Sequence, residues 1–193
     1  YSRTNNPTRQ ALQECLASLE GAAYGLASAS GMSAEDTLLR TLSPGDHIVL
    51  GNDAYGGTFR LISAVLAPMG FAWTATDLTD PDALRAAMRP ETKIVWAETP
   101  TNPLLTVVDI AAIAEIVHEG DARLVVDNTF ATPYLQQPLS HGADVVVHST
   151  TKYCGGHSDV VGGFLATNDT ELSDRLAYPV SYTHLRAHET PCH

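Results

Sequence analysis

Short apolar runs alternate with amphipathic stretches along most of this chain. The runs lie at residues 47–50, 71–76, 93–98, 123–127, 144–148 and 163–167. Stretches with the spacing of an amphipathic helix lie between them, at residues 58–67, 81–88 and 109–119. Apolar strands without internal polar alternation, separated by such helices, predict a three-layer α/β fold with a mainly parallel sheet.

A further helix is predicted near the start of the chain. Asn6 followed by Pro7 is typical of a helix start, with Asn6 as the N-cap and proline at the first helical position. Within this helix the apolar side chains share one face, at Leu12, Cys15, Leu16 and Leu19. Gly21 ends the helix.

Composition narrows the class of protein. With 193 residues and 44% hydrophobic content, the chain can form one globular domain with a sizeable core. The formal charge of −11 argues against nucleic acid as a partner, because phosphate binding needs clustered cations. No stretch is apolar enough to span a membrane, and no signal peptide opens the sequence. The three cysteines have no paired spacing, so we expect a cytoplasmic protein that acts on small molecules.

The two ends of the sequence differ from the rest. Tyr1 stands where a methionine would begin a protein, so we expect an upstream segment that is missing here. Residues 179–193 have no clear period and hold three of the eight histidines. We therefore predict a functional domain over residues 1–178 and a non-native tail over residues 179–193.

Polar side chains follow the predicted strands. They occur at residues 52–57, 98–103, 127–129 and 148–152. Crossover helices place the carboxyl ends of parallel strands along one edge, where α/β sheets bind their ligands. The sequence therefore predicts that these groups converge on one crevice.

Lys152 is the candidate for covalent amine chemistry at this edge. It follows the apolar run 144–148, and partial burial there would lower the pKa of its amine toward that of a usable nucleophile. Lys93, the only other lysine, precedes its apolar run and so falls at the opposite edge. Position alone leaves a surface lysine as the alternative.

Two further side chains suit an aldehyde cofactor that forms an imine with Lys152. Such a cofactor needs its heteroaromatic ring held protonated, and Asp127, at the end of the apolar run 123–127, is placed to do so. Tyr55 precedes two glycines that permit close approach, so its ring could lie flat on the cofactor. The alternatives are a capping or loop carboxylate at Asp127 and an ordinary half-buried tyrosine at Tyr55.

A phosphate group could bind at a predicted helix start. Ser30, Gly31 and Met32 begin a helix after a segment of small residues, and free N–H groups at a helix N-terminus bind phosphate. Ser149 and Thr151 would add two hydroxyl groups. No dinucleotide-binding or P-loop motif is present, and no nucleophile elbow of a serine hydrolase.

One segment of the chain holds side chains of the types that bind zinc. The ligand types gather at His148, Cys154, His157 and Asp159. A second pair of ligands is missing, so we predict no metal.

Six segments together resemble the Cys/Met-metabolism family of pyridoxal-phosphate enzymes. They are Tyr1-Ser2-Arg3 with Asn6-Pro7-Thr8, Ser30-Gly31-Met32, Asp53-Ala54-Tyr55-Gly56-Gly57-Thr58, residues 98–103, residues 126–130 and residues 149–159. They stand in the order of the family and reach to about residue 178. The resemblance implies the large cofactor-binding domain of the aspartate-aminotransferase-like (fold type I) architecture, without its N-terminal segment and small C-terminal domain.

The resemblance also implies a role for each candidate residue. Pyridoxal 5'-phosphate would be bound by Lys152 as the imine lysine and proton shuttle, Asp127 as the partner of the ring nitrogen, and Tyr55 as the stacking ring. The phosphate would be held by Gly31, Met32, Ser149 and Thr151, and by Tyr1 and Arg3 of a neighbouring subunit, with Asn102 near the phenolic oxygen and Glu98 beside it. The expected assembly is a dimer of dimers with shared active sites that acts on small amino-acid substrates.

Within the family we expect the reaction of a cystathionine γ-synthase. That enzyme joins cysteine to an O-acylated homoserine by γ-replacement. Gly57 stands where methionine γ-lyases usually carry a cysteine, which disfavours that activity. Two alternatives remain, a cystathionine γ-lyase and a catalytically silent fragment. The arginine that grips the substrate carboxylate belongs to the C-terminal domain that the chain does not contain.

Overall fold

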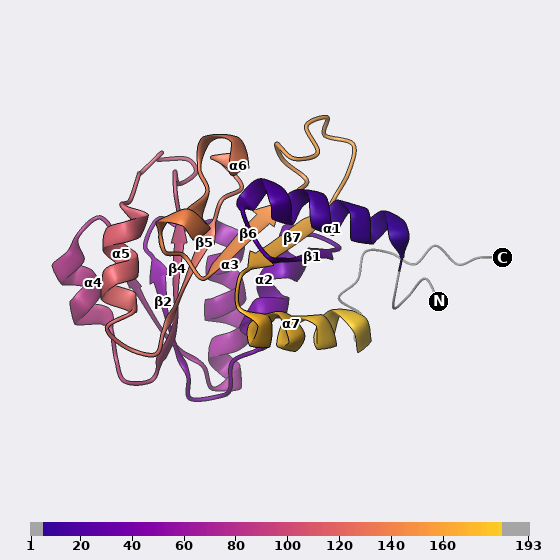
Figure 1. The fold of residues 1–193 in the computed structure, drawn as a ribbon. Helices are drawn as coiled ribbons and strands as arrows, with labels where there is room; N and C mark the ends of the chain where they lie inside the picture. Colours follow the sequence, from indigo (N-terminus) through magenta and orange to yellow (C-terminus); the bar gives the residue numbers. More distant parts are fainter. Residues whose placement is uncertain (1–5, 183–193) are drawn as a thin grey trace.

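One seven-stranded sheet lies between two layers of helices (Figure 1). The structure is a computed structural model that describes residues 6–182, with side chains up to residue 177. The strands are β1 (Tyr24–Ser28), β2 (His47–Gly51), β3 (Ala72–Thr76), β4 (Thr92–Glu98), β5 (Arg123–Asp127), β6 (Val145–Ser149) and β7 (Gly163–Thr167). Their order in the sheet is β1-β7-β6-β5-β4-β2-β3.

Strands β2 to β6 are parallel, whereas β7 is antiparallel to both of its neighbours, β6 and β1. The predicted three-layer, mainly parallel α/β fold is therefore confirmed. The long helices are α1 (Pro7–Glu20), α2 (Gly31–Leu39), α4 (Pro81–Ala87), α5 (Ile110–Val117) and α7 (Thr170–Tyr182). Shorter ones are α3 (Gly56–Arg60), η1 (Leu61–Leu66), η2 (Ala67–Met69), α6 (Thr132–Leu135) and η3 (Pro138–His141).

Alternate side chains of each strand pack on opposite helical layers. On β4, Ile94 and Trp96 join a core with α2, η1 and α7, whereas Val95 and Ala97 join a core with α4 and α5. Helix α1 packs at the other end of the second face, where Ala17 meets β6 and β7. In Figure 1, α1 (indigo) and α7 (yellow) flank β1 and β7. Both faces of the sheet are therefore covered, as strands without polar alternation require.

The pattern of apolar residues did not predict strand β1. Its sequence of small residues gave no strand signal, and its partner β7 lies far away in the chain. Gly25 allows the approach, because a Cβ there would lie 2.6 Å from the Gln13 carbonyl oxygen and 2.7 Å from the Phe164 ring. The strand forms because the backbone of β7 needs a partner and a glycine lets α1 and Phe164 close over it.

The ends of the described chain also differ in detail from the prediction. Helix α1 was predicted correctly, but Leu12 and Leu19 of its apolar face are about half exposed, whereas Ala17 and Glu20 are buried. Helix α7 was not predicted, and it continues past residue 178 to Tyr182. No helix among residues 6–182 is long and apolar enough to cross a membrane.

Candidate active site

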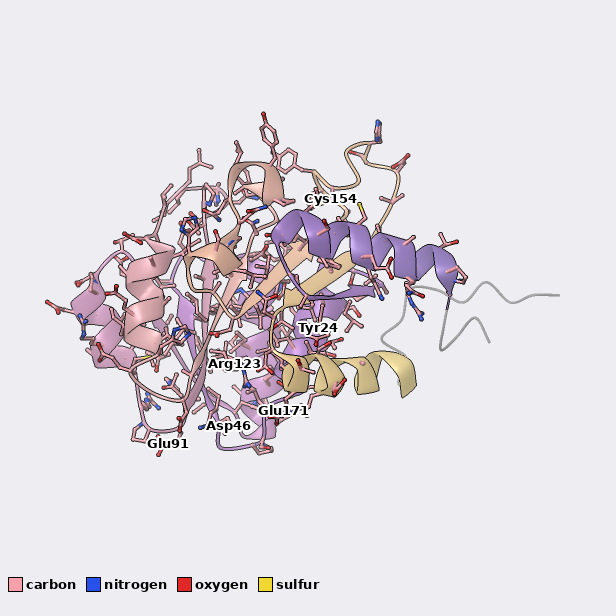
Figure 2. The ribbon with its side chains drawn as sticks, viewed as in Figure 1. Tyr24, Asp46, Glu91, Arg123, Cys154 and Glu171 are labelled. Atoms are coloured by element: carbon pink, nitrogen blue, oxygen red, sulfur yellow. The ribbon has the colours of Figure 1, made fainter. Side chains whose placement is uncertain are left out.

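The polar strand ends meet at one edge of the sheet. Strands β2, β4, β5 and β6 are parallel, so their last residues share this edge; they are Gly51, Glu98, Asp127 and Ser149. Glu98 pairs directly with Asp127, and Asp127 with Val147. In Figure 2, Cys154 beyond β6 marks the upper edge, and Asp46 and Glu91, which precede β2 and β4, mark the lower one. Strand order reverses between β2 and β4, which is where sheets of this type form their ligand crevice.

Asp127 is a buried carboxylate at the end of β5. Its side chain is 8% exposed, and Oδ1 accepts a hydrogen bond of 2.9 Å from the Thr129 backbone N–H. Burial raises the pKa of Asp127, while the hydrogen bonds from Thr129 and the charge of His148 oppose that rise. Thr129 also accepts a 2.8 Å hydrogen bond from the Ser149 N–H, which ties the ends of β5 and β6 together. A cationic group facing Asp127 would offset the cost of its burial.

Glu98 joins two of the predicted loops. One carboxylate oxygen accepts a 2.7 Å hydrogen bond from the Tyr55 N–H and the other a 3.2 Å bond from the Asn102 N–H. Burial and the nearby charge of Asp127 raise the pKa of Glu98 to about 7, against the two backbone hydrogen bonds. The side chains of Tyr55 and Asn102 are both exposed at the edge of the site. Glu98 thus holds both loops by their backbones.

The first turn of α2 lies against the end of β6. A Cβ added to Gly31 would lie 2.8 Å from Cβ and 3.2 Å from Oγ of Ser149, so only glycine lets these two segments approach. Ser30 caps the helix by accepting a 3.1 Å hydrogen bond from the Ser33 N–H. The N-terminus of α2, with its free N–H groups, therefore stands beside the Ser149 hydroxyl, an arrangement suited to an anion.

Tyr55 and Met32 are also brought together. A Cβ added to Gly57 would lie 2.3 Å from the Tyr55 ring and 2.8 Å from the Met32 sulfur. The ring of Tyr55 therefore rests on the glycine backbone at the start of α3. A cysteine at position 57 would displace this ring.

The loop after β6 carries Thr151 and Lys152. The Thr151 hydroxyl donates to the Gly162 carbonyl at 3.2 Å and accepts from the Gly162 N–H at 3.1 Å. Lys152 is exposed, because its turn projects beyond the end of β6 (Figure 1). The partial burial that the sequence suggested for Lys152 is therefore not found within the described residues.

Tyr1 and Arg3, the two residues assigned to a neighbouring subunit, lie outside the described residues. Between residues 6 and 182, no group of three histidine, cysteine, aspartate or glutamate side chains is arranged to hold a metal ion.

The sequence interpretation missed two acidic residues near the site. Glu35, on α2, is 3% exposed and its Oε2 has no hydrogen-bond partner in the described part of the chain. Burial and the charge of Asp127 raise the pKa of Glu35 to about 8, opposed by the Thr58 hydroxyl. Glu20, at the end of α1, binds His148 from the other face of the sheet. An acidic residue inside an otherwise apolar helix was the available signal for Glu35.

The fold and the polar edge together are those of the α/β domains that bind ligands at the carboxyl ends of parallel strands. The chain belongs to the family described as Cys/Met metabolism PLP-dependent enzyme, whose model matches residues 1–184. The cofactor of this family is pyridoxal 5'-phosphate. The site fits that molecule, because Gly31 brings the N-terminus of α2 against the Ser149 hydroxyl, where an anion can bind, and the buried Asp127 suits a protonated ring nitrogen.

Similar proteins carry three related names. The cystathionine γ-synthase of Mycobacterium bovis is 57% identical over 179 residues, which cover 92% of this chain and 46% of that protein. The cystathionine β-lyase of Lactococcus lactis is 52% identical over 178 residues, with 92% and 47% covered. The solved cystathionine γ-lyase from Lactobacillus plantarum, in complex with L-serine, superimposes with a TM-score of 0.92 at 50% identity, covering 94% of this chain and 48% of that one. The chain thus spans about half the length of the relatives that it matches.

Proposed function

We propose that the protein carrying this chain is a trans-sulfuration enzyme that joins cysteine to an O-acylated homoserine and forms cystathionine by γ-replacement. One observation carries the proposal. The lysine-bearing turn after β6, the buried carboxylate of Asp127 and the N-terminus of α2 all lie at the same edge of the sheet. The 57% identity to a γ-synthase supports this reaction ahead of its relatives.

In this proposal the chain supplies the groups that hold the cofactor. The phosphate would be held by the backbone N–H groups of Gly31 and Met32 and by the hydroxyl of Ser149. Thr151 would turn its hydroxyl from Gly162 toward the same phosphate. Asp127 would stabilise a positive charge on the ring nitrogen, in a setting where burial strengthens the attraction.

The remaining proposed contacts concern the rest of the ring and the neighbouring subunit. The Tyr55 ring would stack on the cofactor ring, and Asn102 would lie near the phenolic oxygen. Tyr1 and Arg3 would reach the phosphate of a second subunit, so that the enzyme works as a dimer of dimers with shared sites. Small amino acids are the proposed substrates.

Lys152 is the proposed proton carrier. When bound, pyridoxal phosphate forms a covalent bond to an amine and draws electrons from the adjacent carbon, whose protons become acidic. The Nζ of Lys152 would take such a proton and return it elsewhere on the substrate. A protonated amine cannot act as a base, so activity should fall at low pH.

A cofactor titration of the full-length protein tests these assignments. We expect an absorbance band near about 420 nm on addition of pyridoxal phosphate, which Lys152→Ala abolishes. Lys93→Ala is the matched control, because Lys93 lies in β4 near the opposite edge of the sheet, and the band should persist. A band that survives Lys152→Ala would disprove the lysine assignment.

Product analysis separates the proposed reaction from its alternatives. The alternative reaction is the breakdown of cystathionine by γ- or β-elimination. Its support is the identity of 50% to a γ-lyase and of 52% to a β-lyase. A γ-synthase converts O-succinylhomoserine plus cysteine to cystathionine, whereas a lyase consumes cystathionine and releases a 2-oxo acid. The half-length match favours a silent fragment for residues 1–193 alone, and product formed by that chain would remove this alternative.

A further inference from the structure

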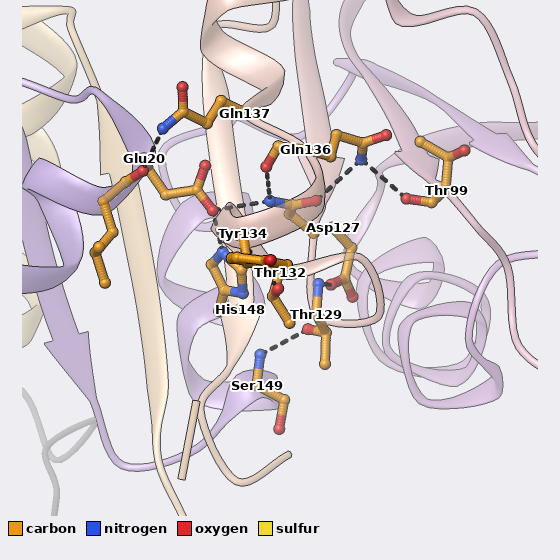
Figure 3. A network of polar contacts seen from close by, with 12 residues as sticks. Glu20, Thr99, Asp127, Thr129, Thr132, Tyr134, Gln136, Gln137, His148 and Ser149 are labelled. Atoms are coloured by element: carbon orange, nitrogen blue, oxygen red, sulfur yellow. Dashed lines mark hydrogen bonds and ion pairs between the residues drawn. The ribbon is translucent and has the colours of Figure 1, made fainter. Parts of the chain in front are cut away.

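A buried cluster of polar side chains lies behind the candidate site (Figure 3). Glu20, the last residue of α1, is 1% exposed, and His148 of β6 is 2% exposed. His148 Nε2 lies 2.5 Å from Glu20 Oε1, and the Asn128 amide donates to the same oxygen at 2.8 Å. The Gln136 amide donates to the Asn128 Oδ1 at 2.9 Å and to the Thr99 carbonyl at 3.0 Å. The cluster therefore joins α1 to β6 and to the segments that follow β4 and β5.

The surroundings of His148 favour its protonated form. Burial lowers the pKa of His148, but the nearby Cys154 and the hydrogen bond and charge of Glu20 outweigh burial and raise the pKa to about 9. The raised pKa and the 2.5 Å contact together favour an imidazolium of His148 facing the side chain of Glu20. A buried ion pair is weak evidence for stability, because loss of hydration offsets most of the attraction. The buried position of the Glu20–His148 pair therefore suggests a role other than stability.

The position of His148 links the pair to Asp127. His148 follows Val147, which is the sheet partner of Asp127, and Asn128 follows Asp127 directly. The side chains of His148 and Asp127 leave their strands toward opposite faces, as alternation along β6 and β5 requires. The charge of His148 still lowers the pKa of Asp127.

Several titratable groups lie around His148 and Asp127. Glu20 from α1 and Cys154 from the loop after β6 face His148. Glu35 from α2 lies near Asp127 on the other face, and Glu98 lies beside Asp127 on β4. The acidic neighbours of Asp127 disfavour its ionised form, whereas the proton on His148 favours it. His148 thus lowers the pKa of Asp127, against the effects of burial and of two nearby carboxyl groups.

We propose that the Glu20–His148 ion pair is a positioning device that keeps Asp127 ionised from behind the sheet, ready to hold the protonated ring of the cofactor. Glu20 retains the proton on His148, and the positive charge of His148 retains the negative charge of Asp127. Asn128 fixes the geometry by bonding to Glu20 while its backbone continues from Asp127. The inference rests on the proposed cofactor site.

The dissociation constant of pyridoxal phosphate, measured in the full-length protein at two pH values, tests the proposal. His148→Gln removes the charge and retains a polar side chain of similar reach. Without that charge Asp127 takes up a proton more readily, so affinity should fall as the pH is lowered. Between about pH 8.5 and pH 6.5 we expect the affinity of His148→Gln to fall by a larger factor than that of the unaltered protein, by up to about tenfold.

Two further variants make the result decisive. Glu20→Gln preserves the hydrogen bonds but leaves His148 without an anionic partner. Its affinity for pyridoxal phosphate should depend on pH in the same way as that of His148→Gln. Glu20→Gln provides the test if His148→Gln does not fold. His118→Gln is the matched control, because His118 forms a 2.9 Å contact with Asp144 ahead of β6, at the opposite edge. Its dependence on pH should equal that of the unaltered protein.

The outcomes separate the inference from the function on which it rests. A variant that binds more weakly by the same factor at both pH values would show a purely structural role and overturn the inference. If the unaltered protein binds the cofactor and both variants keep its dependence on pH, only the inference fails. If the unaltered protein does not bind pyridoxal phosphate, the proposed function and the inference fail together.

Discussion

Glu35→Gln should stabilise the cofactor-free protein, and increasingly so as the pH rises. Burial, the charge of Asp127 and, more weakly, that of Glu98 raise the pKa of Glu35 from 4.5 to about 8, against the effect of Thr58. Between these two values the folded protein holds a proton that the unfolded chain releases, so its stability falls as the pH increases. Glutamine has nearly the same shape and no proton to lose.

The magnitude follows from the two pKa values of Glu35. At pH 7 the solution is about 2.5 pH units above the pKa of Glu35 in the unfolded chain, whereas the folded carboxyl group remains mostly protonated. This difference lowers the free energy of unfolding by about 3 kcal/mol. At about pH 5 the same reasoning gives less than about 1 kcal/mol. The stability gained by Glu35→Gln should therefore grow by about 2 kcal/mol between these pH values.

Urea unfolding of the cofactor-free protein at several pH values measures this gain. Glu115→Gln is the matched control, because Glu115 is an exposed glutamate on α5 and its replacement should not alter the dependence on pH. At each pH the free energy of unfolding of the variant is compared with that of the unaltered protein, which removes the effects of pH that both proteins share. A gain that is constant from about pH 5 to pH 8 would show that Glu35 stays ionised in the folded protein, and it would refute the reasoning.

Two substitutions test the packing around the site by thermal and urea unfolding. Gly163→Ala places a Cβ 2.0 Å from the Ser30 carbonyl oxygen and should cost at least about 3 kcal/mol, whereas Gly120→Ala, with no atom within 4 Å, should change stability by less than about 0.5 kcal/mol. Equal stability of these two variants would contradict the close approach of β7 to the start of α2. Leu124→Ala empties a position on β5 that is 0% exposed and should cost about 2 to 5 kcal/mol, whereas Leu104→Ala, at a 71% exposed position, should cost less than about 0.5 kcal/mol. A loss below about 1 kcal/mol for Leu124→Ala would mean that the centre of the sheet is not closely packed.

The parallel part of the fold could be predicted because its signals are local. Each apolar run, such as residues 123–127, is bounded by helical stretches that fix the direction of the next strand. Strand β1 could not be predicted in this way, because Gly25 and Ala27 carry little apolar surface and the strand depends on a partner at residues 163–167.

The candidate site also has one part that local sequence signals predicted and one part that they did not. The sequence interpretation placed Asp127, Ser149 and the start of α2 at one sheet edge, and the structure has these segments there; their roles remain predictions. It did not anticipate Glu35 or the pairing of Glu20 with His148. Residues 20 and 148 meet only when α1 lies across β6, and no periodicity in the sequence encodes that contact.

The antiparallel strand β7 imposes an order on folding during synthesis. Strands β2 to β6 can assemble one after another as the ribosome releases them, since each pairs with a strand already made. Residues 24–28 emerge early but have no partner until residues 163–167 follow. This early segment therefore stays unpaired until β7 has been made, and β7 must pair with β6 before β1 can join the edge of the sheet.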